Sequence, residues 1–289
     1  MARLVRGQPR RRMLTPVRLA VWGDPIDHSR SPLLHAAAYR ELGLPWEYGR
    51  RRVAEAEFGA TLAERDATWR GLSLTMPLKN VAAAAAVSLD DDARLTGAVN
   101  TLRFTVDGPR GFNTDVGGLA RALREIGVDT PERVRILGAG ATATSAVVTA
   151  VRLGAGAIEV RARRPEAAAP LVALGDALGV PVTVAALAAP EPDGADVTIA
   201  TLPGGTDLGD TASVLASVGG PLVDVVYGNW PTPLAVAWQE AGQQAVNGLG
   251  MLLHQALLQV RVFVGGDPAE PLEREDAVLA AMRTAVMGG

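Results

Sequence analysis

The chain has 289 residues, a formal net charge of −3 and no cysteine. Such a charge gives no broad positive field for nucleic acid or an anionic membrane. No apolar run is long enough to span a bilayer, and the lack of cysteine excludes disulfides and thiolate sites. We therefore expect a cytoplasmic protein that binds neither nucleic acid nor membrane and has room for one large core or two modest ones.

Strands and helices are expected to alternate along the first part of the chain. Residues 1–18 hold six arginines and no acid, and residues 1–16 are predicted to be a disordered Arg-rich tail. Strands are predicted at residues 19–23, 46–51, 71–74 and 99–106. Helices are predicted at residues 31–41, between the second and third strands, and at 80–87.

A second alternating block follows from residue 116. The apolar runs at 196–200 and 222–226 are typical of buried parallel strands. Further strands are predicted at 134–137 and 158–162, and helices at 116–126, 141–153, 166–178, 249–264 and 272–287. This pattern predicts an α/β fold with two α/β domains and a cleft between them, the second domain being a Rossmann-type doubly wound parallel sheet.

Lys79 is the single lysine, against 27 arginines, in a chain whose Lys and Arg total 28. Arginine stays charged, whereas a lysine ammonium can give up a proton. Pro77 precedes the predicted helix at 80–87, which places Lys79 in the first helical turn, where the helix dipole disfavours a positive charge. We therefore consider Lys79 a candidate proton-transfer group; the alternative is an ordinary surface lysine.

Residues 138–143, GAGATA, follow a predicted strand and open a predicted helix. They fit the dinucleotide-binding pattern G-x-G-x-x-G/A. Gly138 would permit the tight turn, Gly140 would let the backbone approach a pyrophosphate, and Ala143 would let the helix pack closely on the sheet. The alternative is a tight strand-to-helix turn without a nucleotide.

The end of the next strand indicates which nicotinamide cofactor is used. An NAD site usually carries an acid there, but this strand ends at Arg163 and Arg164. Glu159 comes earlier, in mid-strand. Because arginine is suited to a 2′-phosphate, we predict NADP(H); the alternative for the arginines is solvated surface charge.

Several polar segments outside this motif stand at strand ends or helix starts. Ser31 and Asp115 taken alone could simply cap helices. The segments are HSRSP at 28–32, TMPLK at 75–79, GAVNT at 97–101, GFNTDVG at 111–117, DVVY at 224–227, TPL at 232–234 and GLGMLLHQ at 248–255. Together these motifs, from about residue 17 to 265, resemble those of the shikimate dehydrogenase family.

The resemblance implies the reversible NADPH-dependent reduction of 3-dehydroshikimate to shikimate. Lys79 and Asp115 would be the catalytic pair, and Ser29 and Ser31 would bind the substrate carboxylate. The remaining implied substrate contacts are Thr75, Asn100 and Gln255 at the ring hydroxyls and Tyr227 in the cleft near the nicotinamide. The implied NADP(H) contacts are Gly138, Ala139, Gly140, Ala141, Thr142, Ala143, Arg163, Arg164, Thr201, Val226, Gly248 and Met251.

The resemblance also implies a division of the chain into domains. Residues 17–115 and 248–289 would form the substrate-binding domain, and 116–247 the NADP-binding domain. The partner would be a small molecule, with the protein a monomer or homodimer. The alternatives are a quinate/shikimate dehydrogenase paralogue that uses NAD, and a non-catalytic NADP-binding regulatory protein.

The chain departs from the family pattern at a few positions. Ser73 replaces the usual Asn before the lysine segment, Ala162 replaces another Asn, and Ala141-Thr142 replaces a Gly-Ala pair. No metal site is expected, because the histidines at 28, 35 and 254 are dispersed. Each histidine is expected to have a structural role.

Overall fold

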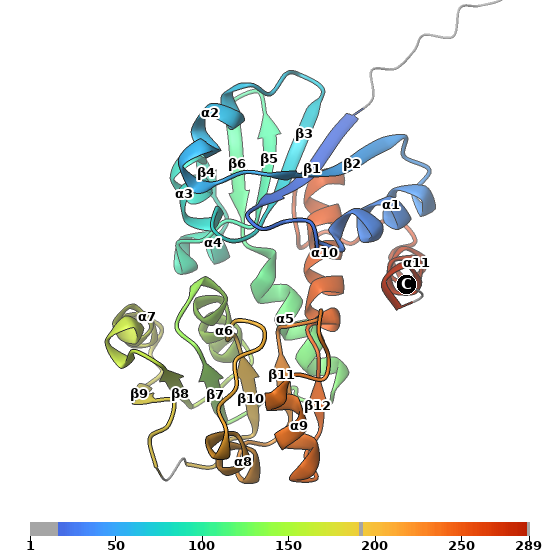
Figure 1. Ribbon diagram of the computed structural model, residues 1–289. Helices are drawn as coiled ribbons and strands as arrows, with labels where there is room; N and C mark the ends of the chain where they lie inside the picture. The colour runs from blue at the N-terminus through green and yellow to red at the C-terminus, as the bar shows by residue number, and fades with distance from the viewer. Residues whose placement is uncertain (1–16, 191–192, 288–289) are drawn as a thin grey trace, which may run out of the picture.

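Two six-stranded sheets form the framework of the protein (Figure 1). The computed structural model describes residues 17–190 and 193–287. The predicted Arg-rich tail at 1–16 lies outside the described residues. Helices cover both faces of each sheet, so the predicted fold of two α/β domains is confirmed.

The first sheet is mixed, with the strand order β2-β1-β3-β5-β6-β4. Strand β1 pairs in parallel with β2 and β3, whereas β5 runs antiparallel to β3 and β6. Its strands are β1 (Val17–Gly23), β2 (Trp46–Arg52), β3 (Trp69–Leu74), β4 (Ser88–Leu89), β5 (Thr101–Thr105) and β6 (Gly108–Phe112).

Alternating residues of β1 face the two sides of this first sheet, as a strand requires. Leu19 packs with one group of helices, and Ala20 and Trp22 pack with the other. The first group is α1 (Ser31–Glu41), α10 (Leu249–Val264) and α11 (Glu275–Met287); the second is α2 (Phe58–Ala63), α3 (Lys79–Ala85) and α4 (Asp91–Thr96), with the 3₁₀ turn η1 (Glu55–Glu57) nearby.

The second sheet is parallel throughout, with the order β12-β11-β10-β7-β8-β9. This is the doubly wound order of dinucleotide-binding folds, as predicted. Its strands are β7 (Arg133–Leu137), β8 (Ala157–Ala162), β9 (Val182–Ala186), β10 (Val197–Ala200), β11 (Leu222–Asp224) and β12 (Ala245–Val246). Its helices are α5 (Thr114–Glu125), α6 (Ala141–Arg152), α7 (Ala169–Leu178), α8 (Asp210–Ser217) and α9 (Pro233–Glu240), with the 3₁₀ turn η2 (Pro165–Ala168).

Helices α5 and α10 lie side by side between the two sheets (Figure 1). Gly118 allows them to approach closely, because a Cβ atom there would lie 2.6 Å from Cβ of Gln255. Asp115 stands one turn before Gly118 on α5. The close crossing therefore brings Asp115 and Gln255, two predicted site residues, to the same place.

Several short elements were not predicted from the sequence. Strand β6 contains Gly and Pro, which are poor strand formers, so local preference does not favour a strand there. Pairing with β5 over five residue pairs overrides that weak local preference. The predicted strand at 222–226 ends early, at Asp224, because its carboxylate accepts the N–H of Val226 and turns the chain.

Within the part of the chain that the structure describes, no helix has both the length and the apolar character needed to cross a bilayer.

Candidate active site

A cavity of about 170 Å³ opens between the two sheets. It is smaller than the roughly 300–1,000 Å³ of sites for drug-sized ligands, so it suits a small molecule. Residues of both domains line it. The predicted site residues in its wall are Ser29, Ser31, Thr75, Lys79, Asn100, Asp115, Thr142, Tyr227, Gly248, Met251 and Gln255.

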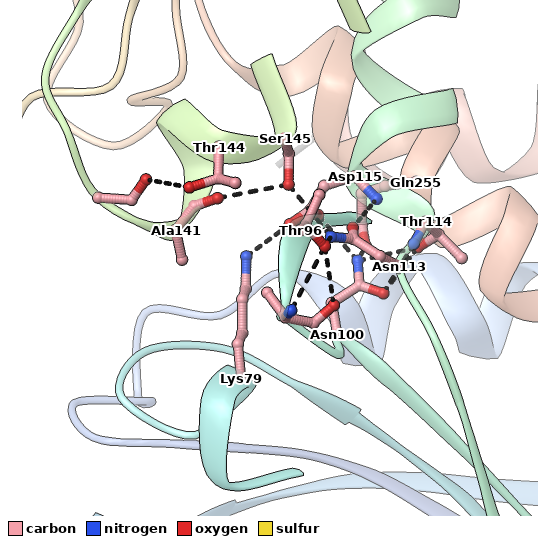
Figure 2. A network of polar contacts seen from close by, with 12 residues as sticks. Lys79, Thr96, Asn100, Asn113, Thr114, Asp115, Ala141, Thr144, Ser145 and Gln255 are labelled. Atoms are coloured by element: carbon pink, nitrogen blue, oxygen red, sulfur yellow. Dashed lines mark hydrogen bonds and ion pairs between the residues drawn. The ribbon is translucent and has the colours of Figure 1, made fainter. Parts of the chain in front are cut away.

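Lys79 and Asp115 form an ion pair in the wall of this cavity (Figure 2). Lys79 is the first residue of α3, which confirms the predicted first-turn position. Its Nζ lies 2.5 Å from Oδ2 of Asp115, and their side chains are only 15% and 7% exposed. The Lys79 ammonium is therefore held in a fixed position by Asp115, and both side chains are largely shielded from solvent.

Asn100 holds the other oxygen of the Asp115 carboxylate. Its Nδ2 donates to Asp115 Oδ1 at 2.8 Å, and its Oδ1 accepts the backbone N–H of Thr114 at 2.9 Å. Asn113 caps helix α5 by accepting the N–H of Asp115 at 3.0 Å. The helix cap is thus Asn113, so Asp115 keeps its carboxylate for Lys79 and Asn100 (Figure 2).

Two serines, Ser29 and Ser31, stand together in the wall of the cavity. Ser31 is the first residue of α1 and makes no side-chain cap; its N–H donates to Ser29 Oγ at 3.4 Å. Arg30 between them donates from Nη1 to the carbonyl of Val286 at 2.8 Å. Burial raises the pKa of the Tyr227 phenol, and the nearby positive charge of Arg30 opposes that rise. Three hydroxyls therefore line this part of the cavity, with the positive charge of Arg30 nearby, and this combination suits an anion.

Gln259 and Ser73 extend the site, although only Ser73 drew attention in the sequence. Ser73 Oγ donates to Gln259 Oε1 at 2.7 Å, and Gln259 Nε2 donates to the carbonyl of Asn100 at 3.1 Å. Both residues line the cavity. The spacing of Gln255 and Gln259, four residues apart on one helix, is the signal that could have identified Gln259.

The three histidines occupy separate places. His35 is fully buried, with Nε2 3.2 Å from Gln259 Oε1, and burial lowers its pKa to about 3. His254 Nε2 lies 2.9 Å from Glu125 Oε1, and burial lowers the pKa of this histidine too. His28 lines the cavity. Among the described residues, no group of three or more His, Asp or Glu is placed to hold a metal ion.

The Gly-rich turn follows β7 and leads into α6 beside a second cavity of about 350 Å³. Gly138 has φ +115°, and a Cβ there would lie 2.4 Å from Thr201 Oγ1. A Cβ on Gly140 would meet no protein atom within 4 Å, so this backbone is open to a ligand. The predicted cofactor residues in the wall of this cavity are Gly138, Ala139, Gly140, Arg163, Arg164 and Thr201.

The other predicted cofactor residues lie elsewhere. Thr142, Gly248 and Met251 line the first cavity. Ala141 begins α6, and Ala143 is fully buried, as close packing of helix on sheet requires. Val226 lines a small separate cavity beside residues 202–206.

Glu159 is occupied inside the second sheet. Its carboxylate lies 2.6 Å from Nε of Arg135 and 2.6 Å from Nε of Arg161, both buried. It therefore does not reach the strand tip, where an acid would bind a ribose hydroxyl. Arg163 and Arg164 stand exposed at that tip. These observations fit a 2′-phosphate better than a free ribose.

The doubly wound sheet, its open Gly-rich turn and the Lys–Asp pair in the adjoining cleft define a two-domain, nicotinamide-nucleotide-dependent dehydrogenase. The shikimate dehydrogenase (NADP(+)) of Anaeromyxobacter sp. is 37% identical over 260 residues, which cover 87% of this chain and 92% of that protein. The chain belongs to the shikimate dehydrogenase family.

Further comparisons agree with this assignment. The family profile of the shikimate dehydrogenase substrate binding domain matches residues 21–102. The crystal structure of Mycobacterium tuberculosis shikimate dehydrogenase is 38% identical, with a TM-score of 0.78, covering 93% of this chain and 100% of that one. The Thermus thermophilus enzyme in complex with NADP(H) and shikimate is 28% identical, with a TM-score of 0.77 and coverages of 93% and 99%.

Proposed function

We propose that this protein catalyses the reversible reduction of 3-dehydroshikimate to shikimate with NADPH. The observation that carries the proposal is the Lys79–Asp115 pair, placed 2.5 Å apart in a small cavity lined by both domains. The motifs of the family occur at these positions, and relatives over most of the chain carry the same activity in their names. The paired Lys79 and Asp115 count against a non-catalytic nucleotide-binding protein.

The bound NADPH supplies the hydride that reduces the ketone carbon. Lys79 donates a hydrogen bond from Nζ to the ketone oxygen and then gives its proton to the alkoxide that forms there. Asp115 fixes the direction of the ammonium, and Asn100 in turn fixes Asp115. In the reverse direction Lys79 accepts the hydroxyl proton.

The rest of the cavity binds and orients the ring. Ser29 and Ser31 bind the carboxylate, and Tyr227 lines the cleft near the nicotinamide. Thr75, Asn100 and Gln255 offer neutral hydrogen-bonding groups to the ring hydroxyls. Many neutral donors and acceptors suit a polyhydroxylated acid. Residues 17–115 and 248–289 form the substrate-binding domain in this proposal.

Residues 116–247 form the NADP-binding domain in the same proposal. The open backbone at Gly140 accepts the pyrophosphate at the start of α6, and Arg163 and Arg164 pair with the 2′-phosphate. Thr201, Val226, Gly248 and Met251 complete the cofactor side. We further infer a cytoplasmic location, in keeping with the absence of cysteine, and a monomer or homodimer.

The test is NADPH oxidation followed by absorbance with 3-dehydroshikimate, alongside the reverse reaction with shikimate and NADP. Quinate in place of shikimate, and NAD in place of NADP, are assayed in parallel. We expect turnover that favours shikimate and NADP. Absence of turnover at micromolar enzyme contradicts the proposal, and equal or better rates with quinate and NAD support the quinate/shikimate paralogue instead.

A further inference from the structure

Tyr48 carries a buried hydroxyl that the described part of the molecule leaves without a hydrogen-bond partner. The residue lies on β2, and its ring stacks on His35 with centroids 3.9 Å apart and planes at 8°. An unpaired buried hydroxyl costs stability, so such groups in native proteins call for an explanation. The explanation lies in the surroundings of this hydroxyl.

Two serines of the substrate cavity lie near the Tyr48 ring, which stacks on His35. Ser31 stands one turn before His35 on α1, and Ser73 Oγ lies 2.7 Å from Gln259 Oε1, which is itself 3.2 Å from His35 Nε2. Burial raises the pKa of Tyr48, and hydrogen-bonding groups on Ser73 and Ser31 oppose that rise. The phenol therefore stays protonated and is available as a donor. The cavity wall includes Ser31 and Ser73 but not Tyr48, so Tyr48 is not placed to contact the substrate itself.

The two serines differ in what they can donate to a bound ligand. Ser73 has already given its hydrogen to Gln259 at 2.7 Å. The Ser31 hydroxyl has no such contact within the described residues, so it can turn toward a ligand. When its hydrogen points at a bound anion, its lone pairs point away from that anion, where a donor behind it can reach them.

We propose that Tyr48 is a positioning residue for the substrate carboxylate, with its O–H donating to Ser31 Oγ while the Ser31 O–H donates to the carboxylate. The proposal rests on the proposed function, because it needs an anionic substrate at Ser31. Hydrogen bonds in such a chain polarise and strengthen one another. The hydroxyl of Tyr48 is thus left unpaired in the free protein and becomes paired when substrate binds.

Tyr48→Phe tests this directly, because it removes only the hydroxyl and keeps the ring on His35. Removing an unpaired hydroxyl leaves the melting temperature of the free protein unchanged or higher. We expect KM for shikimate to rise by about 5- to 20-fold, as for one lost hydrogen bond to an anion-binding group, with kcat changed by less than about twofold.

Tyr39→Phe is the matched control. Tyr39 also contacts His35, but its hydroxyl is already paired, 3.0 Å from Nδ1. Removing this hydroxyl leaves a buried ring nitrogen without its partner, so the melting temperature falls. KM for shikimate stays within about twofold, because the lost contact does not reach Ser31. Tyr48→Phe is therefore expected to raise KM without lowering the melting temperature, and Tyr39→Phe to lower the melting temperature without changing KM.

A carboxylate-specific measurement separates positioning from general loosening of the site. Both variants are assayed with shikimate and with its methyl ester, which keeps the ring hydroxyls and lacks the negative charge. We expect Tyr48→Phe to raise KM for shikimate several-fold more than KM for the ester. Calorimetric titration of shikimate gives the same comparison without turnover.

Some outcomes overturn the inference. Three results in Tyr48→Phe would each show that the hydroxyl has another role. They are an equal rise in KM for shikimate and for its methyl ester, an unchanged KM for shikimate, and a lower melting temperature. The comparison can be interpreted only when the wild-type protein turns over shikimate. A wild-type protein that neither binds nor oxidises shikimate overturns the proposed function itself, and the role of Tyr48 falls with it.

Discussion

Nζ of Lys79 lies 2.5 Å from Oδ2 of Asp115, although 36 positions separate the two residues in the chain. Each residue stands in the first turn of its helix, Lys79 in α3 and Asp115 in α5. We expect Lys79→Ala to lower kcat by about 10²- to 10⁴-fold, the usual contribution of a proton donor, with a much smaller change in KM. Steady-state kinetics with shikimate and NADP measure both quantities.

Arg124→Ala is the control for this substitution, because Arg124 is an exposed basic residue on α5 outside the cleft. Its kinetics should match those of the wild type. If Lys79→Ala retained wild-type kcat, the proposed role of Lys79 as proton donor would be wrong.

Gly138 and Gly140 should respond differently to the same methyl group. Gly138→Ala places Cβ 2.4 Å from Thr201 Oγ1 at a φ of +115°, and we expect about 1–3 kcal/mol lower stability. Gly140→Ala meets no protein atom within 4 Å, so the fold is kept. Because that space would hold the pyrophosphate, KM for NADPH rises by about tenfold or more, as for a loss of at least about 1.4 kcal/mol of binding free energy.

Urea unfolding and NADPH kinetics of the two variants give this comparison. A Gly140→Ala protein that binds NADPH normally would place the pyrophosphate elsewhere. A Gly138→Ala protein of unchanged stability would contradict the close approach of Thr201.

Arg163 and Arg164 should determine the preference for NADP over NAD. Each charge-assisted contact to a phosphate contributes about 1.5–3 kcal/mol, so replacing both arginines by serine should raise KM for NADPH by at least about tenfold. KM for NADH should change little, because NADH has no 2′-phosphate. Arg124→Ser serves as the charge control. An equal change for both nucleotides would instead indicate solvated surface charge.

His35 should make stability depend on pH. Burial lowers its pKa in the folded protein to about 3, against an ordinary value near 6.5. Unfolding therefore takes up a proton below pH 6.5. The stabilisation from the neutral ring is complete above that pH and is lost at about 1.4 kcal/mol per pH unit as pH falls toward 3.

Urea unfolding of wild type and His35→Asn at pH 7, 6 and 5 measures this effect. Between pH 7 and 5 the wild type should lose about 2 kcal/mol more than the variant. The difference isolates His35 from the carboxylates, which titrate in both proteins. Parallel curves for the two proteins would show that His35 does not titrate on unfolding.

Much of the site could be predicted because its residues follow strands. Parallel strands bring their carboxyl ends to one edge, so segments after β1, β3, β7, β10 and β11 meet at the two cavities. Residues whose role depends on tertiary contacts were harder to predict. Gln259 and Tyr48 reach the site only through helix and strand packing, and neither stands in a recognisable motif.

Local sequence preferences also did not determine which residue occupies the N-cap position of α1 and of α5. Ser31 and Asp115 could each have been a cap, but the structure places Arg30 and Asn113 at those positions. The short helices α8 and α9 were not predicted, because each offers only two turns of pattern. Their stability comes from packing Leu215 and Trp238 against the sheet.

The crossing of α5 and α10 at Gly118 has a mechanical consequence. Any rotation of one domain against the other about this crossing displaces each atom in proportion to its distance from the axis. Asp115 and Gln255 stand beside this fulcrum and would hardly move, whereas Arg163 at the rim of the second cavity would travel far. Such a rotation would therefore change the width of the second cavity while leaving Asp115 and Gln255 in the same position relative to each other.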